Sequence, residues 1–244
     1  MVVLESQGQT KINVLGHLEE LRRRVLFVLA VFVVFSGIAF WKGDILVEVL
    51  RVPVRDTVGG FIFISPTEAF AAYIKMAVLA GFVGVFPVIV YHSWKFLSPA
   101  FTVGSGPRVF LWMTLALLLF YAGIGFSYFV AMPAALDFLI GFPGKGVTPS
   151  ISLGEYVSFF AALIVCGGMV FQLPIVMGVA SDLGIIRAED LKKRRKYAVV
   201  AMMILAAIIT PTHDMVNMLI FALPMIGLYE AGIMLSSVLE KKKK

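Results

Sequence analysis

The sequence predicts an all-α membrane protein with six transmembrane helices, and three observations lead to that fold class. First, the 244-residue chain is 60% hydrophobic with a mean hydropathy of +0.95, whereas soluble domains are about 45–50% apolar. Second, six apolar segments are separated by polar or Gly- and Pro-rich connections. Third, lysines and arginines gather in alternate connections, as they do in membrane proteins of fixed orientation.

The expected helices follow these segments in order, and residues 1–244 are expected to form a single polytopic membrane domain. A helix needs about 20 residues to cross the roughly 30 Å hydrocarbon core. The expected spans are residues 25–41, 69–90, 109–133, 157–179, 197–209 and 215–239. The fifth span is so short that it reaches only about 20 Å. It must therefore thin the bilayer or lie low in it.

Three connections carry further local signals. Asn13 is placed to cap a helix that continues into the first span. The stretch "GDILVEVLRVPV" can form a short interfacial helix before Pro53, with Leu46 and Leu50 on one face. Residues 210–214, "TPTHD", read as a tight turn that makes the last two spans a helical hairpin.

Proline and small residues predict how the spans pack. Prolines fall in or at the end of four spans, at Pro87, Pro133, Pro174 and Pro224, and a proline removes a backbone donor and tends to kink a helix. Several kinked helices do not form a simple straight bundle, so a concave face is expected. Small residues four apart, Ala80 with Gly84 and Gly123 with Ser127, predict close helix contacts.

The positive charges predict the orientation. Sixteen Lys and Arg residues lie before the first span, in the second and fourth connections, and in the tail, whereas four lie in the connections on the opposite side. Because cytosolic loops carry the excess of Lys and Arg, both termini are expected in the cytosol. The net charge of +6 is then mostly an orientation signal, and nucleic-acid binding is not expected.

Three polar residues lie inside the spans. Such groups are costly in lipid and tend to face a bundle interior or a wet cavity. Gln172 and Glu230 lie at comparable depths, and either a hydrated concave surface or a helix–helix hydrogen bond accounts for Gln172. Lys75 lies near the outer end of its span and is expected to extend outward toward Glu68 or Glu155.

The stretch "HLEELRRR" places two acids beside three arginines directly before the first span. Glu19 reaches Arg23 and Glu20 reaches Arg24 at i,i+4 spacing. One interpretation is two solvated helix pairs worth about 0.2–0.5 kcal/mol each. The other is a carboxylate site for a cationic ligand at the membrane surface, since carboxylates bind guanidinium groups in a bidentate manner.

Signals for catalysis are missing from the sequence. There is no HExxH, GxxxxGK[ST] or GxSxG pattern, and His17, His92 and His213 are too scattered to share a metal. The lone cysteine, Cys166, lies in an apolar run and is expected to be a small core residue. We therefore expect no enzyme, no catalytic residue, no metal and no cofactor.

Several motifs together resemble the TatC family, the polytopic receptor of the twin-arginine protein translocase. They are "HLEELRRR", "SPTEAF", "FPVIVYHSWKFLSPAF", "FQLPIV", "AEDLKKRRKY" and "TPTHD", in that order over nearly the whole chain. The resemblance implies six membrane helices with both ends cytosolic and short fifth and sixth helices. It also implies the cytoplasmic (inner) membrane of a prokaryote as the location.

The resemblance further implies a function. Twin-arginine signal peptides of folded precursors dock on the cytosolic face, single-span partners of the TatA and TatB type assemble with the receptor in a larger, self-associating complex, and the proton-motive force drives export. The implied signal-peptide residues are Glu19, Glu20, Phe96, Pro99 and Gln172, and the implied partner-helix residues are Ala207, Ile208 and Asp214.

The sequence departs from the family pattern at two places. After "PAF" the family usually has a glutamate, whereas this chain reads "TVGSGPR", and Gln172 stands where the family often has glutamate. Glu19 and Glu20 would then carry most of the arginine recognition. Two alternatives remain: a small secondary transporter with a polar path through Gln172 and Glu230, although the repeats common in transporters are missing, and a scaffold that only gathers single-span helices.

Overall fold

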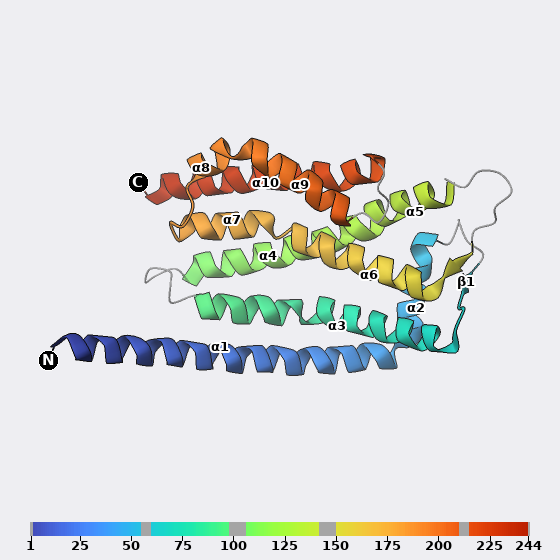
Figure 1. The fold of residues 1–244 in the computed structure, drawn as a ribbon, viewed down its shortest axis with the longest axis horizontal. Helices are drawn as coiled ribbons and strands as arrows, with labels where there is room; N and C mark the ends of the chain where they lie inside the picture. The colour runs from blue at the N-terminus through green and yellow to red at the C-terminus, as the bar shows by residue number, and fades with distance from the viewer. Residues whose placement is uncertain (1, 55–59, 98–105, 142–149, 210–214, 244) are drawn as a thin grey trace.

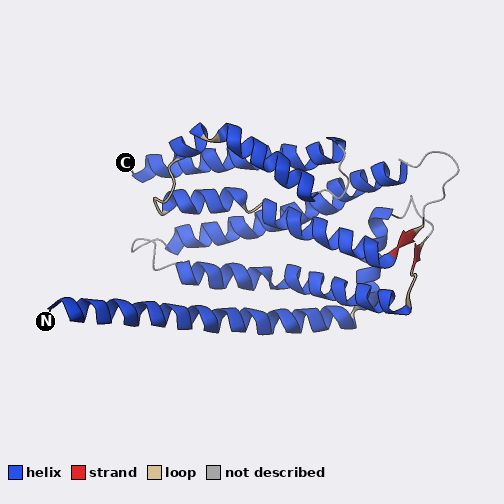
Figure 2. Cartoon of the chain, viewed as in Figure 1, coloured by secondary structure: helices blue, strands red, loops and turns tan. Residues whose placement is uncertain are grey.

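The helices of this chain run side by side in alternating directions (Figure 1). The structure is a computed structural model that describes residues 2–54, 60–97, 106–141, 150–209 and 215–243. The start of α1 and the end of α10 lie at the same end of the bundle, which we call the termini end. The short strands lie at the opposite end, which we call the strand end (Figure 2).

Ten α-helices and two short strands make up the described part of the chain. The helices are α1 (Val2–Trp41), α2 (Gly43–Arg51), α3 (Pro66–Leu97), α4 (Gly106–Phe126), α5 (Met132–Gly141), α6 (Leu153–Val170), α7 (Leu173–Asp182), α8 (Ala188–Lys193), α9 (Arg195–Ile209) and α10 (Met215–Lys243). A 3₁₀ turn (Val52–Val54) follows α2, and a π-helix (Ser127–Ala131) joins α4 to α5. The strands β1 (Phe61–Ile62) and β2 (Ile151–Ser152) pair in parallel.

Five stretches of helix are long and apolar enough to cross a membrane. They are Leu18–Trp41, Pro66–Leu97, Val109–Gly141, Leu153–Asp182 and Met218–Glu240. Each contains or largely overlaps one of the expected spans. The fifth expected span lies in α9, whose 15 residues reach about 22 Å, so the count of six crossings stays a prediction. The expectation of a short sixth helix is wrong, because α10 has 29 residues.

The short helix expected before Pro53 is confirmed as α2, whereas its place at a membrane interface stays a prediction. Leu50 is 1% exposed and lies in the larger core cluster, with Leu46 packed against the same cluster. The hydroxyl of Tyr128 donates to the carbonyl of Val49 at 2.8 Å, and that of Tyr156 donates to the carbonyl of Leu50 at 3.0 Å. These two bonds satisfy carbonyls that a helix end leaves open and fix α2 against the bundle.

Replacing Tyr156 with phenylalanine is expected to lower the free energy of unfolding by about 1–2 kcal/mol. The change leaves the buried Leu50 carbonyl without its side-chain donor while keeping the ring in place. Denaturant unfolding of the purified protein in detergent would measure the loss. Tyr197→Phe is the control, because the side chain of Tyr197 is 66% exposed, and an equal loss in both variants would contradict the assignment.

The close contacts expected from small residues are confirmed. A Cβ built on Gly123 would lie 2.4 Å from the carbonyl oxygen of Gly167, so α4 and α6 meet backbone to backbone there. A Cβ built on Gly84 would lie 2.7 Å from the ring of Phe35 in α1. The closest approach of α1 to α3 was not foreseen from the sequence: a Cβ on Gly81 would lie 2.0 Å from Ser36 Oγ and 2.9 Å from Ser36 N.

The prolines have different local effects. Both α3 and α10 continue through Pro87 and Pro224, so the kinks expected at these two residues stay predictions. Pro133 is the second residue of α5, one residue after the π-helix ends, which suits a residue that cannot donate to the carbonyl four residues earlier. Before Pro174, α6 stops at Val170 and α7 starts at Leu173, with Phe171 and Gln172 as turn residues.

One position before the first span was interpreted wrongly. Asn13 does not start a helix, because α1 already runs from Val2 and passes through residue 13. With 40 residues, α1 is about 60 Å long, about twice the thickness of the hydrocarbon core. The helix therefore extends well beyond any membrane it crosses, and its apolar stretch begins at Leu18.

Candidate functional site

The two acids singled out in the sequence lie near the termini end, where α1 begins its apolar stretch. Glu19 is exposed, and Glu20 is partly exposed. The Glu20–Arg24 pair expected from the spacing is confirmed: Arg24 Nε donates to Glu20 Oε1 at 3.1 Å, and Arg24 Nη2 donates to the same oxygen. The Glu19–Arg23 pair stays a prediction. Glu19, Glu20, Arg22 and Arg23 together line a shallow depression on α1.

Arg24 also connects this charged stretch to the next span. Its Nη1 donates to the backbone carbonyl of His92 in α3 at 3.5 Å. The ring of Phe27 lies 5.0 Å from the His92 ring, measured between centroids. The Glu20–Arg24 pair is therefore held against α3, and its side chains are more fixed than those of a solvated surface pair.

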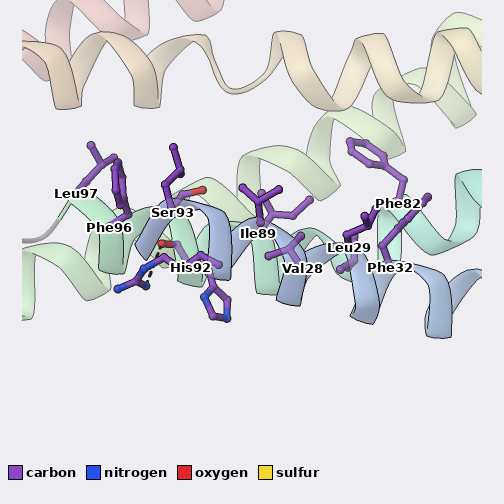
Figure 3. A pocket seen from close by; sticks show the side chains of 13 residues that line it. Val28, Leu29, Phe32, Phe82, Ile89, His92, Ser93, Phe96 and Leu97 are labelled. Atoms are coloured by element: carbon purple, nitrogen blue, oxygen red, sulfur yellow. Dashed lines mark hydrogen bonds between the residues drawn. The ribbon is translucent and has the colours of Figure 1, made fainter. Parts of the chain in front are cut away.

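An apolar groove begins directly beside this pair, between α1 and α3. It has a volume of about 490 Å³. At the termini end it is lined by Arg24, His92, Ser93 and Phe96, and at its deep end by Phe32 and Phe82 (Figure 3). Most of the lining in between is aliphatic, as Val28, Leu29 and Ile89 show.

The groove ends where the two helices meet. Immediately beyond Phe32 and Phe82, Ser36 packs against Gly81, and Phe35 lies against Gly84 at the same end of the groove. The helices are in contact at these pairs and leave space between them toward the termini end. The groove is therefore open at its polar end and closed at Phe35 and Ser36, in the second half of the apolar stretch of α1.

Phe96 lies in this groove, whereas Gln172 is placed elsewhere. The side-chain amide of Gln172 donates to the carbonyl of Ala116 in α4 at 2.9 Å. This is the helix–helix hydrogen bond that the sequence left open as one interpretation, and it joins the break between α6 and α7 to α4. Two residues of the expected sites, Pro99 and Asp214, lie outside the described residues.

The other polar residues within the spans have structural partners. Glu230 Oε2 accepts from Arg195 Nη2 at 2.6 Å, which ties α10 to the start of α9. Lys75 Nζ donates to Ser158 Oγ at 2.7 Å, so the expected partners Glu68 and Glu155 were wrong. With Gln172 and Glu230 each engaged between helices, the structure does not support the polar path required by the transporter alternative.

Glu68 was assigned no role of its own in the sequence, yet it joins three parts of the strand end. Its carboxylate accepts from the backbone N–H of Ile64 at 2.8 Å, from the N–H of Gly154 at 2.9 Å, and from the hydroxyl of Ser152. A Cβ on Gly154 would lie 2.7 Å from Glu68 Cγ. The pattern Ser65-Pro66-Thr67-Glu68 has the spacing of a capping box. This spacing was the feature of the sequence from which a structural role of Glu68 could have been predicted.

Two of the residues expected to bind a partner helix, Ala207 and Ile208, lie at the end of α9. Ile208 is 73% exposed, and Ala207 is partly exposed. An apolar stripe with helical spacing continues from Ile208 toward the start of α9, through Ile204, Val200 and Tyr197, each of which is more than half exposed. One face of α9 is therefore apolar and uncovered by the described part of the chain.

Comparison with known proteins gives a consistent family assignment. Residues 16–224 match the family model described as Sec-independent protein translocase protein (TatC). The Sec-independent protein translocase protein TatC of Aquifex aeolicus is 37% identical over 93% of this chain and 96% of its own length. That of Carboxydothermus hydrogenoformans is 34% identical over 93% of both chains.

A chloroplast protein and a solved structure are also similar. The Sec-independent protein translocase protein TATC of Arabidopsis thaliana is 33% identical over 93% of this chain and 67% of its own. A crystal structure of the twin-arginine translocase receptor TatC superposes with a TM-score of 0.80 and 35% identity, over 92% of this chain and 99% of the other.

Proposed function

Because the chain belongs to the TatC family of Sec-independent protein translocase proteins, we propose that it receives twin-arginine signal peptides at Glu19 and Glu20. Its family role is protein translocation across a membrane, which is transport and not catalysis.

The termini end faces the cytosol of a prokaryotic cell, and the protein lies in the cytoplasmic membrane. Charge supports this orientation, since the basic residues of α8 and the start of α9 lie at the same end as the start of α1 (Figure 1). α9 makes the sixth crossing, which both termini at one end require. At about 22 Å it is shorter than the core, so the bilayer thins beside it.

The exposure of Glu19 next to the Glu20–Arg24 pair is the observation that carries the proposed recognition. A carboxylate accepts a guanidinium group through two parallel hydrogen bonds, and the second arginine of the signal exchanges with Arg24 on Glu20. The apolar part of the signal peptide then enters the bilayer beside α1 and α3, where Phe96 lies at the rim of the groove. Pro99, three residues after Phe96 in the sequence, and Gln172 are proposed as further contacts of the signal peptide.

Single-span partners of the TatA and TatB type are proposed to bind the uncovered stripe of α9. Because α9 is short, a partner helix that packs along its apolar face would cross the membrane where the bilayer is thin. Ala207 and Ile208 lie at the end of that stripe, and Asp214 follows them in sequence. The complex assembles from several such subunits and uses the proton-motive force.

A photo-crosslinking experiment tests the proposal on the purified chain in nanodiscs. A crosslinkable residue at Leu18, which is 56% exposed on α1, reports on a peptide held beside Glu19. A peptide with the arginine pair is expected to crosslink about tenfold more than the same peptide with two lysines, since lysine cannot make the bidentate contact.

The matched control places the same crosslinker at Leu118 of α4, which is 64% exposed, where neither peptide should react above background. Equal crosslinking of the arginine and lysine peptides at Leu18 would refute the recognition site. Export of a twin-arginine reporter in cells that lack their own receptor, on supplying this chain with its partners, is the corresponding test in vivo.

A further inference from the structure

The groove between α1 and α3 has the shape and depth of a lipid site. Along α1 the groove runs from Arg24 at its rim to Phe32, a length of about 12 Å at 1.5 Å per residue, and the contact at Ser36 closes it about 6 Å further on. Half of a roughly 30 Å hydrocarbon core is about 15 Å. The groove is therefore one leaflet deep, which matches an acyl chain that enters from the termini end.

The closed end argues against a membrane-spanning helix as the occupant. A spanning partner needs a surface that continues across both leaflets, but here Ser36 and Gly81 are in van der Waals contact and Phe35 covers Gly84. No side chain larger than hydrogen fits at Gly81 without displacing Ser36. Only a chain that ends near mid-bilayer fills the groove and leaves the helix contact intact.

The rim of the groove carries the charge that a phospholipid head group requires. Arg24 lines the groove, and Lys95 lies in the last turn of α3, near the groove residues Ser93 and Phe96 in sequence. A guanidinium group has five N–H donors, and the described part of the chain engages three of those of Arg24, with Glu20 and His92 as acceptors. The hydroxyl-bearing Ser93 is exposed at the same rim.

We propose that this groove binds one anionic phospholipid of the inner leaflet, with an acyl chain between α1 and α3 and the phosphate at Arg24 and Ser93. The leaflet rests on the orientation given above, but binding of the lipid does not depend on a signal peptide. Because the apolar part of a signal peptide is proposed to enter beside α1 and α3, it competes with the acyl chain for the groove, and the peptide displaces the lipid on docking.

Photoactivatable phospholipids with a diazirine in the middle of the acyl chain test the site on the full chain in nanodiscs. The phosphatidylglycerol probe is expected to label Val28 and Ile89 about fivefold more than the phosphatidylcholine probe, the preference expected of one basic residue at the surface. Leu118, an exposed residue of α4, should react equally with both probes and serves as the internal control.

Two variants separate the parts of the site. Arg24→Gln should bring the ratio of the two probes at Val28 and Ile89 down to the ratio at Leu118. Ile89→Trp should fill the groove and lower labelling of Val28 by both probes, whereas Leu118→Trp should leave it unchanged. The lipid site is refuted if the wild-type ratio in the groove equals that at Leu118, or if Arg24→Gln leaves it unchanged.

A last arm distinguishes this site from the peptide site. Adding the arginine-pair peptide should lower phosphatidylglycerol labelling in the groove, and the lysine-pair peptide should not. If the probe ratios hold but the peptide displaces nothing, the lipid site stands and the proposed peptide docking is wrong. If instead the peptide crosslinks to Ile89 and neither lipid labels the groove above Leu118, the lipid site is wrong and the peptide site stands.

Discussion

Replacing Gly123 with alanine is expected to destabilise the protein, whereas the same replacement at Gly125, two residues along the same helix, is expected to leave it equally or slightly more stable. Alanine is a better helix former than glycine by about 0.5–1 kcal/mol. Both changes would therefore stabilise the protein if packing had no effect. At Gly123, however, the new methyl group would lie 2.4 Å from the Gly167 carbonyl and 2.9 Å from Phe171 Cβ.

The two sites differ in what has to move. At Gly123 the obstacle is backbone, so α4 and α6 must separate, at a cost of about 2–3 kcal/mol. At Gly125 no atom beyond its own stretch of helix lies within 4 Å of where the new methyl group would be. Thermal unfolding of both variants in detergent measures the difference as a drop in Tm for Gly123→Ala alone. A similar drop for both, or none for Gly123→Ala, would mean that the helices do not meet at this point.

Replacing both Glu19 and Glu20 with glutamine is expected to weaken binding of an arginine-pair peptide by a factor of at least about 100. Hydrogen bonds to a charged group contribute about 1.5–3 kcal/mol each, and two are lost while side-chain size is kept. The affinity for the lysine-pair peptide should change much less. Titration of the purified chain in nanodiscs with fluorescent peptides would measure both constants.

Single variants and a control refine this test. Glu19→Gln leaves the Glu20–Arg24 pair in place, and Glu20→Gln releases Arg24, so Glu19→Gln reports on peptide contact without that rearrangement. Glu155→Gln removes an exposed carboxylate at the start of α6, at the strand end, and should leave peptide binding unchanged. Full affinity in the double variant would exclude these acids as the arginine receptors.

Much of the fold was predictable because hydrophobicity and small residues act locally. Apolar runs gave the spans, helical spacing gave the face of α2 that buries Leu50, and the pair Gly123/Ser127 identified a close helix contact. The Glu20–Arg24 pair followed from i,i+4 spacing. In each case the interacting residues are either a few positions apart in the sequence, or the contact depends only on a residue being small.

Long-range partners were not predictable in the same way. From its depth in the span, Lys75 was expected to extend toward Glu68 or Glu155. In the structure, α6 is rotated so that Ser158 faces Lys75 instead. Glu230 was grouped with Gln172 by depth, but the approach of α9 pairs it with Arg195. The groove itself depends on where α1 and α3 diverge, and that follows from the Ser36–Gly81 contact, 45 residues apart in the chain. The depth of a residue in its span can be counted from the sequence, but it does not tell which neighbouring helix the residue faces.

The hydrogen bonds around Glu68 have a mechanical consequence for the whole bundle. One carboxylate and the β1–β2 pair fasten the stretches that precede α3 and α6 to each other, at the end of the molecule opposite the groove. The helices are thus connected at the strand end and separated by the groove at the termini end. The Ser36–Gly81 contact lies between these two regions. A group inserted between α1 and α3 would therefore separate them on the termini side of that contact, where the groove already holds the two helices apart.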